Sequence, residues 1–190
     1  MSERTWTAPP QTTALPGQGP DARPNGGGKA DADRFKRVFR HHPAGVAVVT
    51  FRTRAGPAGF TATSVISVSA DPPVLAFSVA SGTSAHALVR TVPRVAVNLL
   101  AEDQAELARR FAAHGADRFA GCPWRELPTG EPVLSGTVSW LSGSLLGLVE
   151  AGSSLIATVE VHEAHRNRPA RPLVYADRTF RTLGGEARTH

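Results

Sequence analysis

The sequence predicts a mainly β domain built around an antiparallel barrel, with two or three flanking helices. Apolar, β-branched runs recur about every eight to twelve residues between Gly45 and Tyr175, a spacing typical of antiparallel strands joined by turns. Few segments show the apolar spacing of a helix, which disfavours a parallel sheet of βαβ units. No Gly-x-Gly-x-x-Gly follows a strand-like run, so a Rossmann nucleotide site is not supported.

Length and composition limit the architecture and the class of protein. The 190 residues are 41% hydrophobic and 19% charged, which suits one globular domain with a substantial core. Apolar runs such as 46–49 and 145–149 are far shorter than the roughly 20 residues of a membrane helix. The N-terminus lacks the pattern of a secretory signal, so we expect a soluble cytoplasmic protein with no membrane partner. Cys122 is the only cysteine, which excludes an internal disulfide.

The positive charge of the chain raises the question of nucleic-acid binding. The formal net charge is +5 and the pI is near 10.6, but the basic residues are almost all arginine and are spread along the sequence. Tyr175 is the only tyrosine, and no interleaving of aromatic and basic residues indicates a platform for stacking bases. We therefore expect no nucleic-acid partner, and we attribute the charge to the attraction of phosphate-bearing small molecules.

The composition divides the chain into a folded domain and two tails. Residues 1–30 contain five prolines and hardly any large apolar side chain, so they cannot bury enough surface to fold and we expect a disordered tail. The pattern changes at Asp31, and we place the folded domain at 31–184 and a short C-terminal tail at 185–190.

The expected elements follow from apolar periodicity and turn residues. A short helix from about Asp31 carries Phe35, Val38 and Phe39 on one face and ends before Pro43. Further helices are expected at 84–90 and 102–113. Strands are expected at 45–51, 62–69, 74–80, 95–100, 133–141, 145–150, 154–163 and 172–175, with turns at 54–57 and around 121–124.

One short motif suggests a ligand site. After Gly59, interpreted as a turn, come Thr61, Ala62, Thr63 and Ser64, which are small and mostly hydroxylated. Such a surface lets a flat ring with acceptor atoms at its edge come close to backbone and hydroxyl donors. The same residues also suit a Thr-rich edge strand, so composition alone leaves both interpretations open.

The order of the motifs along the chain resembles the flavin reductase-like family. The resemblance covers about Phe35 to Leu183 and depends on several linked landmarks rather than on one. They are Pro43-Ala44-Gly45-Val46, Gly59-Phe60-Thr61-Ala62-Thr63-Ser64, Ser67-Val68-Ser69 with Asp71-Pro72-Pro73, Val95-Ala96-Val97-Asn98-Leu99-Leu100, Leu107-Ala108-Arg109-Arg110-Phe111-Ala112 and Asp117-Arg118-Phe119.

This resemblance implies a fold, a reaction and partners. Members are FMN-binding split β-barrels, a Greek-key type of antiparallel barrel, and they form homodimers. Many are the reductase component of two-component monooxygenases, often in bacterial antibiotic biosynthesis. The implied reaction passes a hydride from NADH or NADPH to FMN or FAD, and the reduced flavin then serves a partner monooxygenase. The flavin is the reactive centre, so no catalytic side chain is expected.

The resemblance also implies roles for individual residues. Thr61, Ala62, Thr63 and Ser64 would hold the edge of the isoalloxazine ring and the ribityl chain. The remaining flavin contacts would come from Pro43 and Ser78 lining the site, Ser84 near the phosphate, and Arg118 and Phe119 closing over the ring.

The chain departs from the family pattern at two places. Where the family often has Asn-Ser-x-Thr at the flavin phosphate, this chain has Ser84-Ala85-His86-Ala87, in which His86, with Arg90, would replace lost hydroxyls. Where the family has Gly-Asp-His beside the nicotinamide, this chain has Gly152-Ser153-Ser154. Two alternatives therefore stay open: a flavin-reductase fold diverted to a pathway intermediate without nicotinamide, or a non-enzymatic flavin carrier.

The remaining single residues indicate structural roles. His162 and His165 are three apart on a predicted strand, so they would point to opposite faces and we expect no metal site. Cys122 has no neighbouring base and is interpreted as a loop thiol. Trp124 and Trp140 are interpreted as packing residues.

Overall fold

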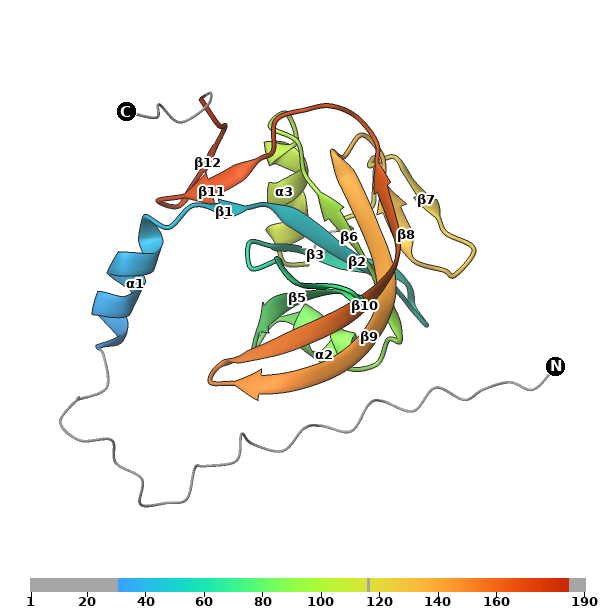
Figure 1. Ribbon diagram of the computed structural model, residues 1–190, viewed down its shortest axis with the longest axis horizontal. Helices are drawn as coiled ribbons and strands as arrows, with labels where there is room; N and C mark the ends of the chain where they lie inside the picture. The colour runs from blue at the N-terminus through green and yellow to red at the C-terminus, as the bar shows by residue number, and fades with distance from the viewer. Residues whose placement is uncertain (1–30, 116, 185–190) are drawn as a thin grey trace, which may run out of the picture.

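The computed structural model describes residues 31–115 and 117–184. Within these ranges the chain is mainly β-structure, with three helices set around a strongly curved sheet (Figure 1). The tails that we predict for residues 1–30 and 185–190 lie outside the described residues. The domain limits of 31–184 therefore stay a prediction.

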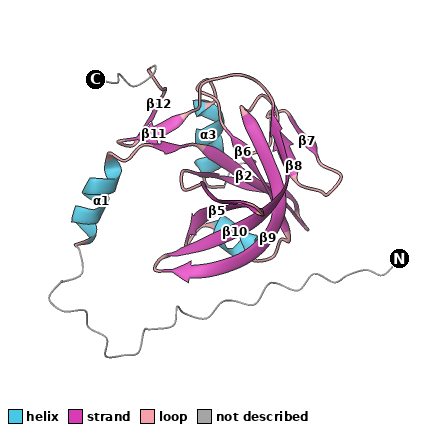
Figure 2. Ribbon diagram, in the orientation of Figure 1, coloured by secondary structure: helices cyan, strands magenta, loops and turns pink. Residues whose placement is uncertain are grey.

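Seven antiparallel strands form the main sheet, which curls into an open barrel (Figure 2). Their spatial order is β3-β2-β6-β9-β10-β5-β4, so the sheet does not close into a ring between β3 and β4. This open, split form of barrel agrees with the fold class that the sequence predicts. The strands are β2 (Ala47–Thr53), β3 (Gly56–Ala62), β4 (Ile66–Ala70), β5 (Pro73–Ala80), β6 (Arg94–Leu99), β9 (Ser139–Ala151) and β10 (Ser154–Arg166).

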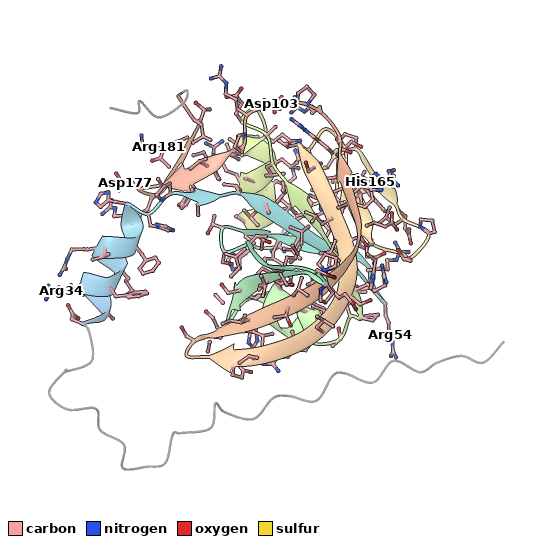
Figure 3. The ribbon with its side chains drawn as sticks, viewed as in Figure 1. Arg34, Arg54, Asp103, His165, Asp177 and Arg181 are labelled. Carbon is pink, nitrogen blue, oxygen red and sulfur yellow. The ribbon has the colours of Figure 1, made fainter. Side chains whose placement is uncertain are left out.

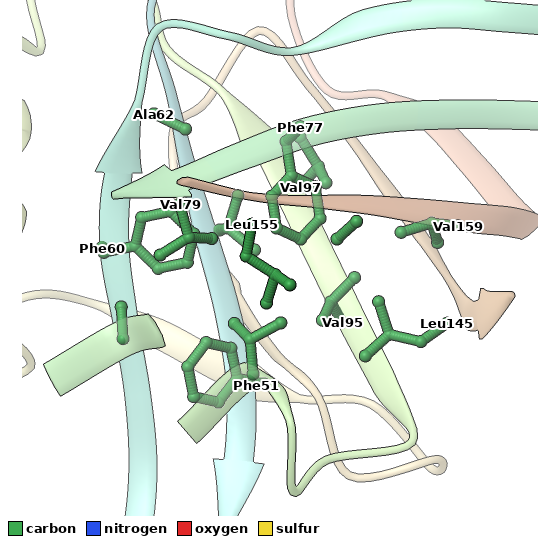
Figure 4. Close-up of a cluster of buried hydrophobic side chains, with 14 of the residues drawn as sticks. Phe51, Phe60, Ala62, Phe77, Val79, Val95, Val97, Leu145, Leu155 and Val159 are labelled. Atoms are coloured by element: carbon green, nitrogen blue, oxygen red, sulfur yellow. The ribbon is translucent and has the colours of Figure 1, made fainter. Parts of the chain in front are cut away.

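An apolar core fills the inside of the barrel (Figure 4). The ring of Phe60 lies between those of Phe51 and Phe77, with centroids 6.4 and 6.0 Å away. On β6, Val95 and Val97 belong to this core, while Ala96 between them packs on the opposite side of the sheet. The two-residue alternation of a strand thus buries β6 on both faces.

The three helices of the described residues have different relations to the barrel. α1 (Ala32–Arg40) begins at Asp31, whose carboxylate accepts hydrogen bonds from two backbone amides, and none of its residues is buried. In Figure 1 it projects away from the sheet. α2 (Ser84–Val89) follows β5, and α3 (Ala105–Ala112) packs Phe111 into a second apolar cluster. No helix of the described chain is both long and apolar enough to cross a membrane.

Two small sheets complete the fold. One joins β1 (Ala44–Gly45), β11 (Val174–Ala176) and β12 (Thr179–Arg181), and the other joins β7 (Trp124–Glu126) and β8 (Pro132–Leu134). The sequence did not predict β7 or β12, because strands of three residues are too short to show a two-residue periodicity. It also did not predict β3, because the glycines of this segment were interpreted as turn residues.

The interpretation of Gly59 as a turn is wrong, because this residue lies inside β3 and opposite Thr50 of β2. A Cβ atom at this position would lie 2.8 Å from the carbonyl oxygen of Val49 and 3.1 Å from the ring of Phe111. Gly59 is therefore required for the close packing of α3 on the sheet rather than for a turn.

Two further predicted strands are interrupted. The sequence predicts one strand over 62–69, but β3 ends at Ala62 and β4 begins only at Ile66. The predicted strand over 133–141 is divided between β8 and β9, with Gly136 at a φ of +72° in the turn between them. In both places a run of strand-forming residues continues through the break, so periodicity alone could not locate it.

Candidate functional site

A hollow of about 320 Å³ lies where the connection between β3 and β4 meets β5, α2 and the end of α3. It brings together seven of the predicted site residues, which are far apart in the sequence: Thr61, Thr63, Ser64, Ser78, Ser84, Arg118 and Ser154. The other lining residues are Phe60, Val79, Ala80, Thr83, Ala85, Phe111, Ala112 and His114. The wall therefore combines apolar side chains with several hydroxyl groups.

Ser64 fixes the connection between β3 and β4 to the neighbouring strand. Its hydroxyl donates to the carbonyl oxygen of Ser78 at 3.2 Å and accepts from the amide of Ser78 at 2.9 Å. The side chain thus makes the two hydrogen bonds to the Ser78 backbone that a neighbouring strand would make, at the place where β3 and β4 are interrupted. With Ser64 held in this way, the neighbouring Thr63 stays exposed at the edge of the hollow.

Thr61 joins the sheet to α3. Its hydroxyl donates to the carbonyl oxygen of Ala108 at 2.6 Å, so it fixes the distance between β3 and the helix. Thr61 therefore shapes the hollow while its hydroxyl is already engaged.

Four predicted flavin contacts do not line the hollow: Pro43, Ala62, Phe119 and His86, the last of which belongs to α2. Ala62 is buried in the core, and Pro43 is exposed before β1. Phe119 packs edge-to-face on Phe111 and Trp124, with centroids 5.1 and 5.4 Å away. The assignment of all four as flavin contacts stays a prediction for this chain.

Arg118 lines the hollow, but most of its guanidinium N–H groups are hydrogen-bonded to backbone carbonyl oxygens. It donates to the carbonyl oxygen of Ala113 at 3.1 and 2.7 Å and to that of Gly59 at 2.5 Å. These bonds tie the loop after α3 back to β3 and satisfy a carbonyl at the end of the helix. Arg118 is therefore a positioning residue that also gives this wall a positive charge.

The segment around α2 supplies Ser84 to the hollow, but not His86 and Arg90, which were expected to replace the lost hydroxyls. His86 does not line the hollow, and its Nε2 atom is buried with no hydrogen-bond partner among the described residues. Arg90 forms an ion pair with Glu150. The expectation that Arg90 helps to replace the missing phosphate grip is therefore not supported by its position.

The departure at residues 152–154 forms the tip of the β9–β10 hairpin. Ala151 pairs with Ser154 across a two-residue loop, and Gly152 has a φ of +60°, which suits such a loop. The carbonyl oxygen of Ser153 accepts from the amide of Ser81 at 2.9 Å and so attaches the loop to the end of β5. Of the three residues, Ser154 lines the hollow, whereas Gly152 and Ser153 do not.

The hollow suits a planar ligand with polar edges and a negative charge. Within the described residues, the hydroxyls of Thr63, Ser84 and Ser154 make no hydrogen bond to the protein, so they are free to bind a ligand. The lining includes His114 and Arg118 and no carboxylate. A volume of about 320 Å³ lies within the usual range for small-molecule sites. These features fit a flavin.

A second hollow of about 550 Å³ adjoins the first, and the two share Thr61, Thr63 and Ala112 as lining residues. Its other lining residues are Arg109, Ala113, Tyr175, Arg178, Thr179 and Phe180. Sequence reasoning missed this hollow, because α3 and the β11–β12 hairpin are more than sixty residues apart and neither carries a binding motif.

A third hollow of about 470 Å³ is apolar and lies apart from the first two. Its walls come from the ends of β2 and β6, from β4 and from β9 and β10, with Gly45, Ile66, Leu99, Leu141 and Leu173 among the lining residues. Ile66 is 60% exposed beside it.

Trp140, His162 and His165 each contact other side chains of the protein. Trp140 is buried and stacks on His165, with centroids 4.4 Å apart. The Nε2 atom of His162 lies 3.0 Å from the hydroxyl of Ser144. Among the described residues, no group of three His, Cys, Asp or Glu side chains is arranged to hold a metal ion.

Fold and site together define the class of the protein: the chain belongs to the flavin reductase-like family, and the family model for the flavin reductase like domain matches residues 39–184. The resemblance predicted from the motifs is therefore confirmed. NADH:FMN oxidoreductase of Rhodococcus erythropolis is 39% identical over 149 residues, which cover 76% of this chain and 78% of the relative.

Two other relatives show the range of the family. Actinorhodin polyketide dimerase of Streptomyces coelicolor is 36% identical over 155 residues, covering 81% of this chain and 88% of the relative. The reductase subunit HsaB of a flavin-dependent monooxygenase from Rhodococcus jostii is 30% identical over 145 residues, covering 76% and 74%.

Two solved structures share the fold over nearly their whole length. A flavin reductase domain protein from Arthrobacter sp. FB24 superimposes with a TM-score of 0.78 at 33% identity, covering 82% of this chain and 98% of the other. The NADH:FAD oxidoreductase SgcE6 of Streptomyces globisporus, in complex with NAD and FAD fragments, has a TM-score of 0.77 at 32% identity, covering 83% and 96%.

Proposed function

We propose that the chain is an NAD(P)H-dependent flavin reductase that supplies reduced FMN or FAD to a partner monooxygenase. The observation that carries this proposal is the hydroxyl-lined hollow with its positively charged wall, in a chain of the flavin reductase-like family. Relatives named as NADH:FMN oxidoreductase and as the reductase subunit of a flavin-dependent monooxygenase support the reaction and its purpose. Such a reaction belongs in the cytoplasm, where the reduced nicotinamide pool is held.

A bound flavin would supply the chemistry, because its ring accepts a hydride from a reduced nicotinamide. The protein would bind the flavin and the nicotinamide and orient their rings. Thr63 and Ser154 lie on the wall of the same hollow, so their hydroxyls can bond a polar ring edge or the ribityl chain. Ser64 and Arg118 hold the connecting segments in place through backbone hydrogen bonds. Rigid positioning of two ring systems is the main requirement for hydride transfer.

We further propose that the chain acts as a homodimer. α1 exposes Phe35, Val38 and Phe39 on one face, with exposed fractions of 55, 68 and 56%. A monomer rarely leaves so many large apolar side chains in water. On β4, Ile66 and Val68 are 60 and 55% exposed, and Ile66 lines the apolar hollow. We propose that a second copy of the chain covers these surfaces.

The function is tested by steady-state oxidation of NADH and NADPH with FMN, FAD and riboflavin side by side. We expect turnover that depends on both the nicotinamide and the flavin. Replacing Thr63 by Leu puts a bulky apolar side chain on the wall of the hollow and should weaken flavin binding at least about tenfold. The matched control is Thr129→Leu, since Thr129 is an exposed turn residue outside the three hollows.

The results separate the parts of the proposal. Unchanged flavin affinity in Thr63→Leu would show that the site is misplaced. Absence of nicotinamide oxidation with every flavin would refute the reductase function.

One observation favours a second candidate, a flavin-reductase fold diverted to a pathway intermediate. Ser154 stands in the hollow where the family pattern has a histidine, and actinorhodin polyketide dimerase is among the relatives. This candidate predicts flavin binding without oxidation of NADH or NADPH, so the same assay decides between the two.

A further inference from the structure

The second hollow has the composition of a site for an anionic aromatic ligand. Its 550 Å³ are lined by two arginines, Arg109 and Arg178, and by the aromatic rings of Tyr175 and Phe180. The lining contains no carboxylate. Thr63 adds a hydroxyl with no hydrogen bond to the described protein, whereas the hydroxyls of Thr61 and Thr179 donate to backbone carbonyl oxygens. Cations fit phosphate and flat rings fit a nucleobase.

The aromatic rings and the guanidinium group that line this hollow pack against one another. The guanidinium of Arg109 lies over the ring of Phe180, 5.3 Å from its centroid, and is oriented by Glu106 at 2.7 Å. The rings of Tyr175 and Phe180 meet edge-to-face with centroids 5.2 Å apart. An aromatic pair and a planar cation thus share one wall, and each can stack on a flat ligand.

Arg178 is presented by a tight and well-anchored turn. Ala176 pairs with Thr179, so Asp177 and Arg178 form a two-residue hairpin loop with φ values of +50° and +59°. Asp177 is anchored by the guanidinium of Arg40 at 2.6 Å and by its own amide, which donates to the carbonyl oxygen of Arg40 at 2.7 Å. Figure 3 shows Asp177 where the end of α1 meets this hairpin.

The side chain of Arg178 makes no hydrogen bond or ion pair within the described residues that would explain its position. Its backbone lies in the left-handed region, which glycine adopts most readily, and its side chain lines the hollow. Within the described part of the chain, no carboxylate lies close enough to form an ion pair with it. An exposed arginine beside a hydroxyl-lined hollow can bind a phosphate by donating hydrogen bonds to its oxygens.

We propose that this second hollow binds the phosphorylated adenosine half of a dinucleotide. The inference rests on the proposed function, because the hollow shares Thr61, Thr63 and Ala112 with the candidate flavin site. A ligand whose flavin or nicotinamide ring occupies the first hollow can therefore extend its adenosine phosphate into the second. FAD and NADH both carry this group, whereas FMN and reduced nicotinamide mononucleotide do not.

The direct test is the binding of AMP to the full-length protein, measured by isothermal titration calorimetry. We expect saturable binding that Arg178→Gln weakens about tenfold, the effect of losing one charged contact to phosphate. Arg178→Gly removes the same guanidinium while it relaxes the turn, so its loss of AMP binding cannot come from a damaged hairpin. Arg181→Gln is the matched control, because it removes an equal charge from β12 outside the hollow.

Two comparisons identify which dinucleotide uses the hollow. If the adenosine phosphate belongs to FAD, Arg178→Gly weakens FAD binding about tenfold and leaves FMN binding unchanged. If it belongs to NADH, the variant raises KM for NADH about tenfold and leaves KM for reduced nicotinamide mononucleotide unchanged. Either pattern supports the proposal.

The proposal is overturned if AMP does not bind, or if Arg178→Gly and Arg181→Gln affect AMP equally. It also fails if the variant changes FMN and FAD binding alike. These outcomes differ from a failure of the proposed function, in which AMP binds through Arg178 but no flavin is reduced.

Discussion

Three hydroxylated residues at the end of β3 show how small differences in contact decide a residue's role. Thr61 is bonded to α3 and Ser64 to β5, while Thr63 between them has no partner within the described chain. The first and third hold two walls of the hollow at a fixed distance. The second is left free for a ligand.

Cys122 gives a residue-scale prediction that is independent of the ligand. Burial raises the pKa of its thiol, and the nearby Arg110 lowers it only partly. A raised pKa means a smaller fraction of thiolate at any pH below it, and the thiolate is the reactive form. We expect iodoacetamide to modify the folded protein at pH 8 several-fold more slowly than the urea-unfolded chain. Equal rates would contradict the burial of this thiol.

The serine pair at the β9–β10 hairpin predicts a gain of function. Restoring the family pattern by Ser153→Asp with Ser154→His puts an imidazole on the wall of the hollow. One charge-assisted hydrogen bond to the nicotinamide substrate contributes about 1.5–3 kcal/mol, so kcat/KM for NADH should rise about ten- to a hundredfold. The measurement is steady-state kinetics at fixed FMN. A double variant that still binds FMN but gains nothing would favour the diverted function.

At the scale of elements, the packing of α3 on the sheet depends on Gly59. Gly59→Ala would force its Cβ against the carbonyl of Val49 and the ring of Phe111. We expect a loss of about 1–3 kcal/mol in the free energy of unfolding, measured by urea denaturation. Gly45→Ala is the control, because a Cβ there meets nothing within 4 Å and should change stability by less than about 0.5 kcal/mol. Equal stability of the two variants would contradict this packing.

The fold was largely predictable from the sequence because strand periodicity and turn residues act locally. The helix beginning at Asp31 and the strands β5, β6 and β10 lie close to the predicted ranges. The structure corrects the turn at Gly59 and the unbroken strand at 62–69, where tertiary contacts decide. A glycine beneath α3 and a serine that replaces a strand pair leave no periodic signal.

The candidate site was predictable only in part. The motif at Thr61–Ser64 led to the side of the barrel where the first hollow lies, and Ser84, Arg118 and Ser154 line the same hollow. The hollow beside the β11–β12 hairpin was missed, because it depends on the pairing of β1 with β11 and on the packing of α3. Long-range pairings of short strands carry almost no local sequence signal.

At the scale of the whole molecule, the exposed face of α1 predicts self-association. We expect multi-angle light scattering to give about twice the 20.0 kDa mass of one chain at micromolar concentration. Phe39→Glu puts a charge on the apolar face and should give the monomer mass. Lys36→Gln is the control on the same helix. A wild-type mass near that of one chain would contradict the dimer.

The most direct test of the central claim is the bleaching of FMN absorbance near 450 nm by NADH without oxygen. If the chain is a flavin reductase, catalytic amounts of it will bleach an excess of FMN over many turnovers, and Thr63→Leu will do so far more slowly. Absorbance that falls no faster than in a protein-free control, while the protein binds FMN, would contradict the account.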